Sequence, residues 1–191
     1  MSASSYNQLP DNLPVPLDDG AAGHLPGKLL QELDLASTRG GRVSLKNLAG
    51  TVVIYCYPMT GVPGIPLPDG WDQIPGARGC TPQSCSYRDH YQELHALGAL
   101  VYGLSSQESE YQREMADRLH LPFAVLSDAE LHLNQLLKLP VFQTAGMTLY
   151  KRLTLIIQDG VIEAVHYPIF PSDSDVVWVL EHLKRKAAAM G

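Results

Sequence analysis

Apolar runs of strand length recur along the chain and are separated by longer segments with helical spacing. Residues 51–57 (TVVIYCY) form a nearly continuous β-branched and aromatic run, which is typical of a strand buried on both faces. Residues 99–105 (ALVYGLS) and 123–128 (FAVLSD) have the same character. These runs predict buried strands of a central sheet.

The segments between and after these strands have the spacing of amphipathic helices. Four apolar residues recur along one helix face before Gly98, namely Tyr87, Tyr91, Leu94 and Leu97. A second helix is expected over about 108–119, with three inward side chains: Tyr111, Met115 and Leu119. Residues 129–139 predict a third helix, which Pro140 stops, and residues 172–189 predict a last one with Ser172 or Ser174 as its N-cap.

Two glycine turns predict hairpins. Gly40-Gly41 separates two short strand-like runs, and Asp159-Gly160 divides LTLIIQ from VIEAVHY with one of the strongest short-range turn signals. Strands and helices alternate up to the second hairpin, which adds an antiparallel edge. The pattern predicts an α/β fold with a central mixed β-sheet flanked by helices. In such sheets active sites lie beyond the carboxyl ends of the strands. Cys80 lies in the connection that leaves the strand at 51–57.

Two segments lie outside this alternation. Residues 1–25 are rich in Pro, Asp, Gly and Ser without a period, and they predict an N-terminal arm before one domain at 26–191. The proline- and glycine-rich insertion at about 61–78 is long for a connection, and segments of this kind tend to be functional or disordered. We interpret it as an ordered flap anchored by Trp71 and Ile74.

Composition narrows the class of protein. A chain of 191 residues with 45% hydrophobic and 18% charged residues suits one globular domain. A net charge of -6 argues against nucleic acid as a main partner, and the basic cluster at 184–186 suits a helix C-terminus. No apolar run is long enough to span a membrane, and the N-terminus lacks the features of a secretory signal. With only three cysteines, the expected compartment is the reducing cytoplasm.

Candidate chemistry centres on Cys80 and Cys85 in GCTPQSC. Thr81-Pro82 resembles a helix start, so Cys80 is expected at a helix N-terminus, where the dipole favours the reactive thiolate. Residues five apart on a helix have Cα atoms roughly 8.6 Å apart. A disulfide needs less than about 7 Å, so these two cysteines can bond only after local unwinding. One sulfur would face a pocket and the other would lie near solvent, which suits a two-step redox cycle.

Other interpretations of the cysteines remain. Both can be ordinary structural residues, and Cys56, within an apolar strand, reads as a small buried hydrophobe. A zinc site can be assembled from four residues spaced by five: Cys80, Cys85, His90 and His95. Successive steps of five turn about 140° around a helix axis, so these side chains cannot gather into a tetrahedron.

The stretch GCTPQSCSYRD, preceded by a strand ending in YCYP, resembles the peroxiredoxins of the Q type, also called bacterioferritin co-migratory proteins. The resemblance extends over roughly residues 28–183. It implies a thioredoxin-like fold and a thiol-dependent peroxidase that needs no cofactor and no metal. Cys80 would be the peroxidatic cysteine, Cys85 the resolving one, and Arg152 in KRLTLI the arginine that holds the thiolate and polarises the peroxide. Hydroperoxides would be the substrates, and thioredoxin or a similar dithiol the reductant of a monomer or homodimer.

The sequence departs from the family pattern before Cys80. The family places a proline and a threonine seven and three residues before this cysteine, whereas position 77 is alanine. We therefore match Pro58 and Thr60 in YPMT to the motif, which requires the loop to fold back and bring Thr60 beside Cys80. Pro58 and Gly79 are the expected substrate-binding positions.

Arg78 and the loop leave further interpretations open. Arg78 could add charge to the site, although a solvated loop arginine is the simpler interpretation. A general disulfide reductase on the same fold is a second functional hypothesis, which the Cx4C spacing and Arg152 disfavour. A non-catalytic redox-regulated binding protein or chaperone is a third. Its contact surface would be the apolar loop residues Val62, Ile65, Leu67 and Trp71, which could equally pack onto the domain.

Overall fold

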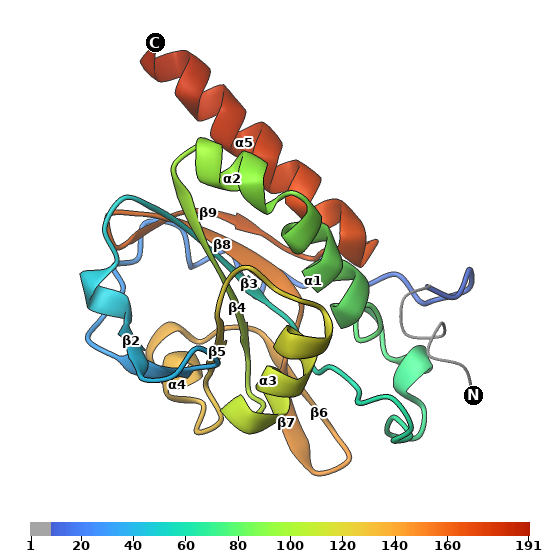
Figure 1. The fold of residues 1–191 in the computed structure, drawn as a ribbon. Coiled ribbons are helices and arrows are strands. Elements are labelled where there is room, and N and C mark those ends of the chain that lie inside the picture. Colours follow the sequence, from blue (N-terminus) through green and yellow to red (C-terminus); the bar gives the residue numbers. More distant parts are fainter. Residues whose placement is uncertain (1–8) are drawn as a thin grey trace.

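Seven strands form one mixed sheet in the order β2-β1-β5-β4-β3-β8-β9 in the computed structural model, which describes residues 9–191 (Figure 1). The strands are β1 (Asp34–Ser37), β2 (Arg42–Ser44), β3 (Thr51–Cys56), β4 (Ala99–Ser105), β5 (Val125–Ser127), β8 (Leu153–Gln158) and β9 (Val161–His166). β3 pairs in parallel with β4, and β4 with β5, while the remaining pairs are antiparallel. The expected mixed central sheet and both glycine-turn hairpins are confirmed.

Helices cover both faces of this sheet. They are α1 (Cys80–Asp89), α2 (Tyr91–Ala96), α3 (Ser109–Arg118), α4 (His132–Leu137) and α5 (Asp175–Met190), with short 3-10 turns η2 (Leu45–Asn47), η3 (Trp71–Gln73) and η4 (Ser172–Ser174). Helices α1, α2, α3 and α5 pack on one face, and α4 packs on the other (Figure 1). No helix within residues 9–191 is long and apolar enough to cross a bilayer.

The alternation of side chains along β3 divides the interior into two cores. Val53 and Tyr55 face the α1 and α5 side, whereas Ile54 and Cys56 face the α4 side. All four side chains are buried, as the continuous apolar run predicts. Cys56 and Cys80 therefore belong to cores on opposite faces of the sheet.

Helix boundaries differ from the sequence expectation at two places. The helix expected through residues 87–97 is broken, because His90 leaves helical geometry with φ −101° and ψ 8° between α1 and α2. α4 begins only at His132 and ends before Lys138, whose left-handed backbone stops the helix ahead of Pro140. Ser174, one of the two serines expected there, is the N-cap of α5. Its hydroxyl makes no capping bond to the helix and donates instead to the carbonyl of Pro171 at 2.8 Å.

A second, two-stranded sheet was missed from the sequence. β6 (Val141–Thr144) and β7 (Met147–Tyr150) form a hairpin around Ala145 and Gly146, both with positive φ. Its polar residues interrupt the apolar pattern and weaken the strand signal. The hairpin matters because its second strand leads directly into Lys151 and Arg152.

The described part of the N-terminal arm lies against the domain, while residues 1–8 of that expected segment fall outside the described residues. Asp19 accepts hydrogen bonds from Lys151 Nζ at 2.7 Å and from the Tyr167 hydroxyl at 2.8 Å. These two bonds hold the pKa of Asp19 well below its usual range. Leu25 is fully buried in the α4-side core.

The segment from Pro58 to Gly79 is ordered by a small third core. Trp71 is buried in it with Ala77 and Leu149, and Ile74 packs against the same cluster. Trp71 and Ile74 thus anchor the loop as expected. Ile65 remains 54% exposed, while Val62, Leu67 and Ile74 are partly buried, so Trp71 is the one large apolar side chain of the insertion that is fully covered.

Candidate active site

Cys80 is the first residue of α1. This helix begins at the end of the long loop that follows β3 (Figure 1). Its side chain is buried with 4% exposure, and its sulfur lies 3.7 Å from the carbonyl oxygen of Ala77. Gly79 occupies the N-cap with φ 111°. A Cβ there would lie 2.3 Å from the hydroxyl oxygen of Ser172, so only glycine allows the loop to enter the helix this closely. The helix N-terminus therefore points at the sulfur, and its dipole favours a thiolate there.

Arg152 reaches the same sulfur because β8 runs antiparallel to β3. Leu153, the first residue of β8, pairs with Cys56, the last residue of β3. The residue just before β8 is thereby placed at the carboxyl end of β3, where α1 begins. Arg152 Nη2 lies 3.3 Å from Cys80 Sγ.

The partners of the buried guanidinium favour a negative charge on the sulfur. Arg152 is 3% exposed and donates to the side-chain oxygen of Gln83 and to the carbonyl oxygens of Gly76, Ala77 and Arg78. These four oxygens are all neutral. A buried cation is costly unless an anion balances it, and a thiolate formed at Cys80 would lie within hydrogen-bond distance of this cation.

The loop folds back and brings Thr60 to the cavity beside Cys80. The cavity has a volume of about 20 Å³ and is lined by Met59, Thr60, Gly61, Leu67, Trp71, Arg78, Gly79, Cys80 and Thr81. A volume of roughly 10–15 Å³ is enough for one water molecule, so this space holds only a very small group. Pro58 is buried where β3 leads into the loop and is not among the lining residues.

Thr60 is held by Gln107, the second residue after β4. Gln107 Oε1 accepts from the Thr60 backbone N–H at 3.0 Å and from its hydroxyl at 3.3 Å, and Gln107 Nε2 donates back to the Thr60 carbonyl at 3.2 Å. Because the hydroxyl gives its only hydrogen to Gln107, it can act toward other groups only as an acceptor. Thr60 thus occupies a fixed position although about 20 residues separate it from Cys80 in the sequence.

The interpretation of Arg78 as a solvated loop residue is wrong. Its side chain is only 15% exposed, it lines the small cavity, and its Nη1 donates to Asp72 at 3.0 Å. The turn η3 positions Asp72 for this ion pair. A second guanidinium therefore borders the space beside Cys80.

Cys85 lies on the same helix but in a different environment. It is half-buried, and burial raises its pKa while the nearby Arg88 guanidinium opposes that shift. The structure contains all three cysteines as free thiols. Cys56 is fully buried in the other core, and burial raises its pKa, so it suits the structural role expected for it.

Residues that sequence reasoning missed connect the site to α5. Gln83 bridges Arg152 and the buried carboxylate of Asp175, to which its Nε2 donates at 2.8 Å. The only sequence signal is position: Gln83 lies one turn beyond Cys80 and is polar on a helix face that must be buried. Asp175 and Gln107 carry no local signal, because their partners are distant in sequence.

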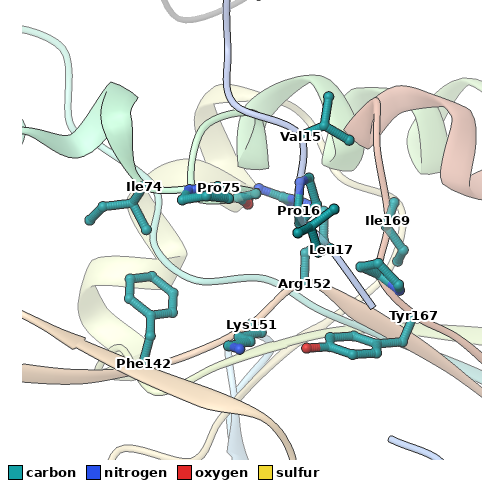
Figure 2. A pocket seen from close by; sticks show the side chains of 12 residues that line it. Val15, Pro16, Leu17, Ile74, Pro75, Phe142, Lys151, Arg152, Tyr167 and Ile169 are labelled. Carbon is teal, nitrogen blue, oxygen red and sulfur yellow. The ribbon is translucent and has the colours of Figure 1, made fainter. Parts of the chain in front are cut away.

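A second, larger cavity lies beside the loop residues Ile74, Pro75 and Gly76. It has a volume of about 390 Å³ and is lined by Val15, Pro16, Leu17, Ile74, Pro75, Gly76, Phe142, Lys151, Arg152, Tyr167, Pro168 and Ile169. Figure 2 shows Lys151 between the rings of Phe142 and Tyr167, with the arm residues Pro16 and Leu17 near Arg152. Cys80 does not line this cavity, so Arg152 and the loop separate it from the reactive sulfur.

Within residues 9–191, no three His, Cys, Asp or Glu side chains are grouped closely enough to hold a metal ion. A buried thiol at a helix N-terminus contacts a buried guanidinium at one edge of this mixed sheet, an arrangement that suits thiol chemistry.

The Redoxin family profile matches residues 19–180, and the chain belongs to this family. Within it, the chain is similar to the peroxiredoxins of the Q type. Over 95 residues it is 37% identical to the chloroplastic peroxiredoxin Q of Sedum lineare, a match that covers 49% of this chain and 43% of that relative. The chain therefore spans less than half the length of this relative. It is also 29% identical to the putative peroxiredoxin bcp of Coxiella burnetii, over 78% of this chain and 91% of the other.

Solved structures have the same fold. The peroxidoxin BcpB of Mycobacterium tuberculosis superposes with a TM-score of 0.69 at 23% identity, over 85% of this chain and 98% of the other. The bacterioferritin comigratory protein of Xanthomonas campestris superposes with a TM-score of 0.65 at 18% identity, over 92% and 99%. These likenesses establish the thioredoxin-like fold that the sequence resemblance implied.

Proposed function

We propose that the protein is a thiol-dependent peroxidase that reduces hydrogen peroxide and organic hydroperoxides at Cys80. The observation that carries this proposal is the 3.3 Å contact between Arg152 and the buried sulfur at the start of α1. A helix N-terminus and a cation together favour the nucleophilic thiolate. The same cation can stabilise the negative charge that develops as the oxygen–oxygen bond breaks.

In the first step the Cys80 thiolate attacks the terminal oxygen of the hydroperoxide. A sulfur–oxygen bond forms and the oxygen–oxygen bond breaks, which leaves a sulfenic acid on Cys80 and releases hydroxide or an alkoxide. The leaving oxygen takes a proton and departs as water or an alcohol. Arg152 stabilises the developing charge, and the Thr60 hydroxyl, whose own hydrogen goes to Gln107, accepts a hydrogen bond from the peroxide O–H in the small cavity.

In the second step the Cys85 thiol attacks the sulfenic sulfur. A disulfide forms and water leaves. Because helical residues five apart have Cα atoms roughly 8.6 Å apart, whereas a disulfide needs less than about 7 Å, the first turns of α1 must unwind. An external dithiol, thioredoxin or a similar protein, then exchanges with the disulfide and restores both thiols.

The size of the cavity bears on the substrate. The space beside Cys80 measures about 20 Å³, so in the closed site it accepts the hydroperoxide group but not an alkyl chain. The chain of an organic hydroperoxide must extend outward past the loop. The Xanthomonas campestris protein with this fold was described for its alkyl peroxide reduction activity, which supports organic hydroperoxides as a substrate class here.

Burial of the thiol argues against a general disulfide reductase. Such an enzyme must present its thiolate to the disulfide of another protein. Cys80 is 4% exposed, and the space beside it measures about 20 Å³. This space accommodates a small peroxide group but not the disulfide of another protein. The binding-protein hypothesis loses two of its four contact residues, because Trp71 is buried and Leu67 packs against the Trp71 cluster.

The proposed function is tested by the consumption of hydrogen peroxide in the presence of thioredoxin, thioredoxin reductase and NADPH. Cys80→Ser should abolish turnover, whereas Cys56→Ser, a matched substitution in the opposite core, should keep it. Unchanged turnover in the Cys80 variant would show that the proposed chemistry is wrong.

A further inference from the structure

Asp175, the first residue of α5, is a fully buried carboxylate with an unusual number of partners. It accepts four hydrogen bonds, from Gln83 Nε2 at 2.8 Å, the Tyr87 hydroxyl at 2.8 Å, the Thr154 hydroxyl at 2.7 Å and His166 Nδ1 at 2.8 Å. Burial and this carboxylate raise the pKa of Tyr87 well above its usual value, so Tyr87 remains a donor. A buried carboxylate is retained in a core only when such donors satisfy it.

Two of the four donors come from the helix that carries Cys80. Gln83 and Tyr87 lie one and two turns beyond Cys80 on α1, whereas Thr154 and His166 come from the sheet strands β8 and β9. Asp175 therefore ties α1 to the sheet. Its neighbours in η4 add to the junction, because Ser86 donates to the carbonyl of Asp173 at 2.9 Å and Ser172 packs on Gly79.

The Gln83 amide carries this effect to the active site. An amide has one donor end and one acceptor end, so donation of Nε2 to Asp175 turns Oε1 the other way. Oε1 accepts from Arg152 Nη1, and Arg152 Nη2 lies on Cys80 Sγ. A continuous buried chain thus runs from Asp175 through Gln83 and Arg152 to the sulfur.

We propose that Asp175 is a positioning residue that acts on the two steps of the cycle in opposite directions. By orienting Gln83, it holds Arg152 on the Cys80 sulfur and speeds the attack on peroxide. By holding Gln83 and Tyr87, it keeps α1 folded and slows the approach of Cys85. This inference rests on the proposed peroxidase function.

Asp175→Asn is the direct test. The new side-chain amide can turn in two ways. In one, its N–H group faces the three donors Gln83, Tyr87 and Thr154, and those hydrogen bonds are lost. In the other, its oxygen accepts from them, but the bonds are neutral and about half as strong as bonds to a carboxylate. In stopped-flow experiments with hydrogen peroxide, oxidation of Cys80 should slow about tenfold, and disulfide formation should become about tenfold faster. Hydrogen exchange of α1 amides in the reduced protein should rise by a similar factor.

Asp128→Asn is the matched control. Asp128 is also a buried carboxylate before a helix, but its hydrogen bonds go to the backbone of Leu133 and Asn134 in α4 and to the Tyr150 hydroxyl. This variant should lose comparable stability and leave both rate constants within about twofold of wild type. Gln83→Leu interrupts the chain at its middle and should reproduce the opposite changes if Asp175→Asn fails to fold.

Rates that fall together in Asp175→Asn, or that stay unchanged there and in Gln83→Leu, would overturn the inference. A wild-type protein whose Cys80 does not react with peroxide would instead refute the proposed function. In that case the exchange experiment still decides whether Asp175 holds α1 closed, because it involves no peroxide. Exchange in α1 that is the same as wild type would then reject the positioning role.

Discussion

Cys80 and Cys85 lie on one helix, yet the structure surrounds them differently. Cys80 is 4% exposed at the helix N-terminus, with the Arg152 guanidinium 3.3 Å from its sulfur. Cys85 lies near the middle of the helix and is half-buried, and its pKa is raised mainly by burial. The two surroundings differ in the way that the proposed cycle requires: one thiol contacts a cation at the start of the helix, and the other lies farther along the folded helix.

Replacing Cys85 should separate the two roles most sharply. In Cys85→Ser, turnover with a dithiol reductant should fall at least 100-fold, because no resolving thiol remains. Cys80 should still react once with peroxide at close to the wild-type rate. Mass spectrometry after dimedone trapping should find one sulfenic acid per chain, at Cys80. Sustained wild-type turnover, or a disulfide between Cys56 and Cys80, would remove Cys85 from its assigned role.

Replacing the cation should remove most of the advantage of Cys80. Arg152→Lys keeps the charge but loses the planar fork that reaches Gln83, the loop carbonyls and the sulfur together. Loss of one charge-stabilising donor typically lowers rates by about 100-fold, and we expect that effect on the peroxide step. The second-order rate constant from stopped-flow fluorescence provides the measurement. Arg78→Lys is the control, since Arg78 borders the cavity and pairs with Asp72, and this variant should lose less than tenfold.

Much of the site around Cys80 could be predicted from the sequence. The distant residues that hold its side chains in place could not. The motif around Cys80 and Cys85, the buried strand before it and Arg152 all follow from local patterns and family resemblance. The bond from Gln83 to Asp175 spans 92 residues, and no periodicity encodes such a pairing. The β6–β7 hairpin was missed because Gln143 and Thr148 interrupt its apolar alternation. The break at His90 was missed because the apolar stripe continues across it.

Removing the hydroxyl of Thr60 should have an intermediate effect. Thr60→Val preserves the side-chain shape and the backbone bond to Gln107 but removes the hydroxyl of residue 60 from the cavity. We expect the peroxide step to slow by about tenfold, with the disulfide step unchanged. Thr60→Ser should recover most of the rate. A silent Thr60→Val variant would show that Thr60 is not the motif threonine.

The smallest effect that we expect is the dependence of the disulfide step on pH. Burial raises the pKa of Cys85 in folded α1, so folding favours its neutral thiol. That stabilisation is present below the ordinary thiol pKa of about 8.5 and is lost as pH rises through the folded-state value. Disulfide formation should therefore become severalfold faster between about pH 7.5 and pH 9.5, as both opening and deprotonation become easier. A disulfide rate that is flat over this range would contradict the protected state of Cys85.

The central claim is that peroxide reacts with Cys80 while α1 is folded and that Cys85 reaches it only after the helix opens. Pulsed hydrogen exchange after mixing with one equivalent of peroxide tests this claim most directly. We predict that sulfenic acid forms at Cys80 while the amides of α1 remain protected, and that protection at the start of α1 is lost in step with disulfide formation. Loss of protection before the sulfenic acid appears, or a disulfide that forms while α1 stays protected, would contradict the account.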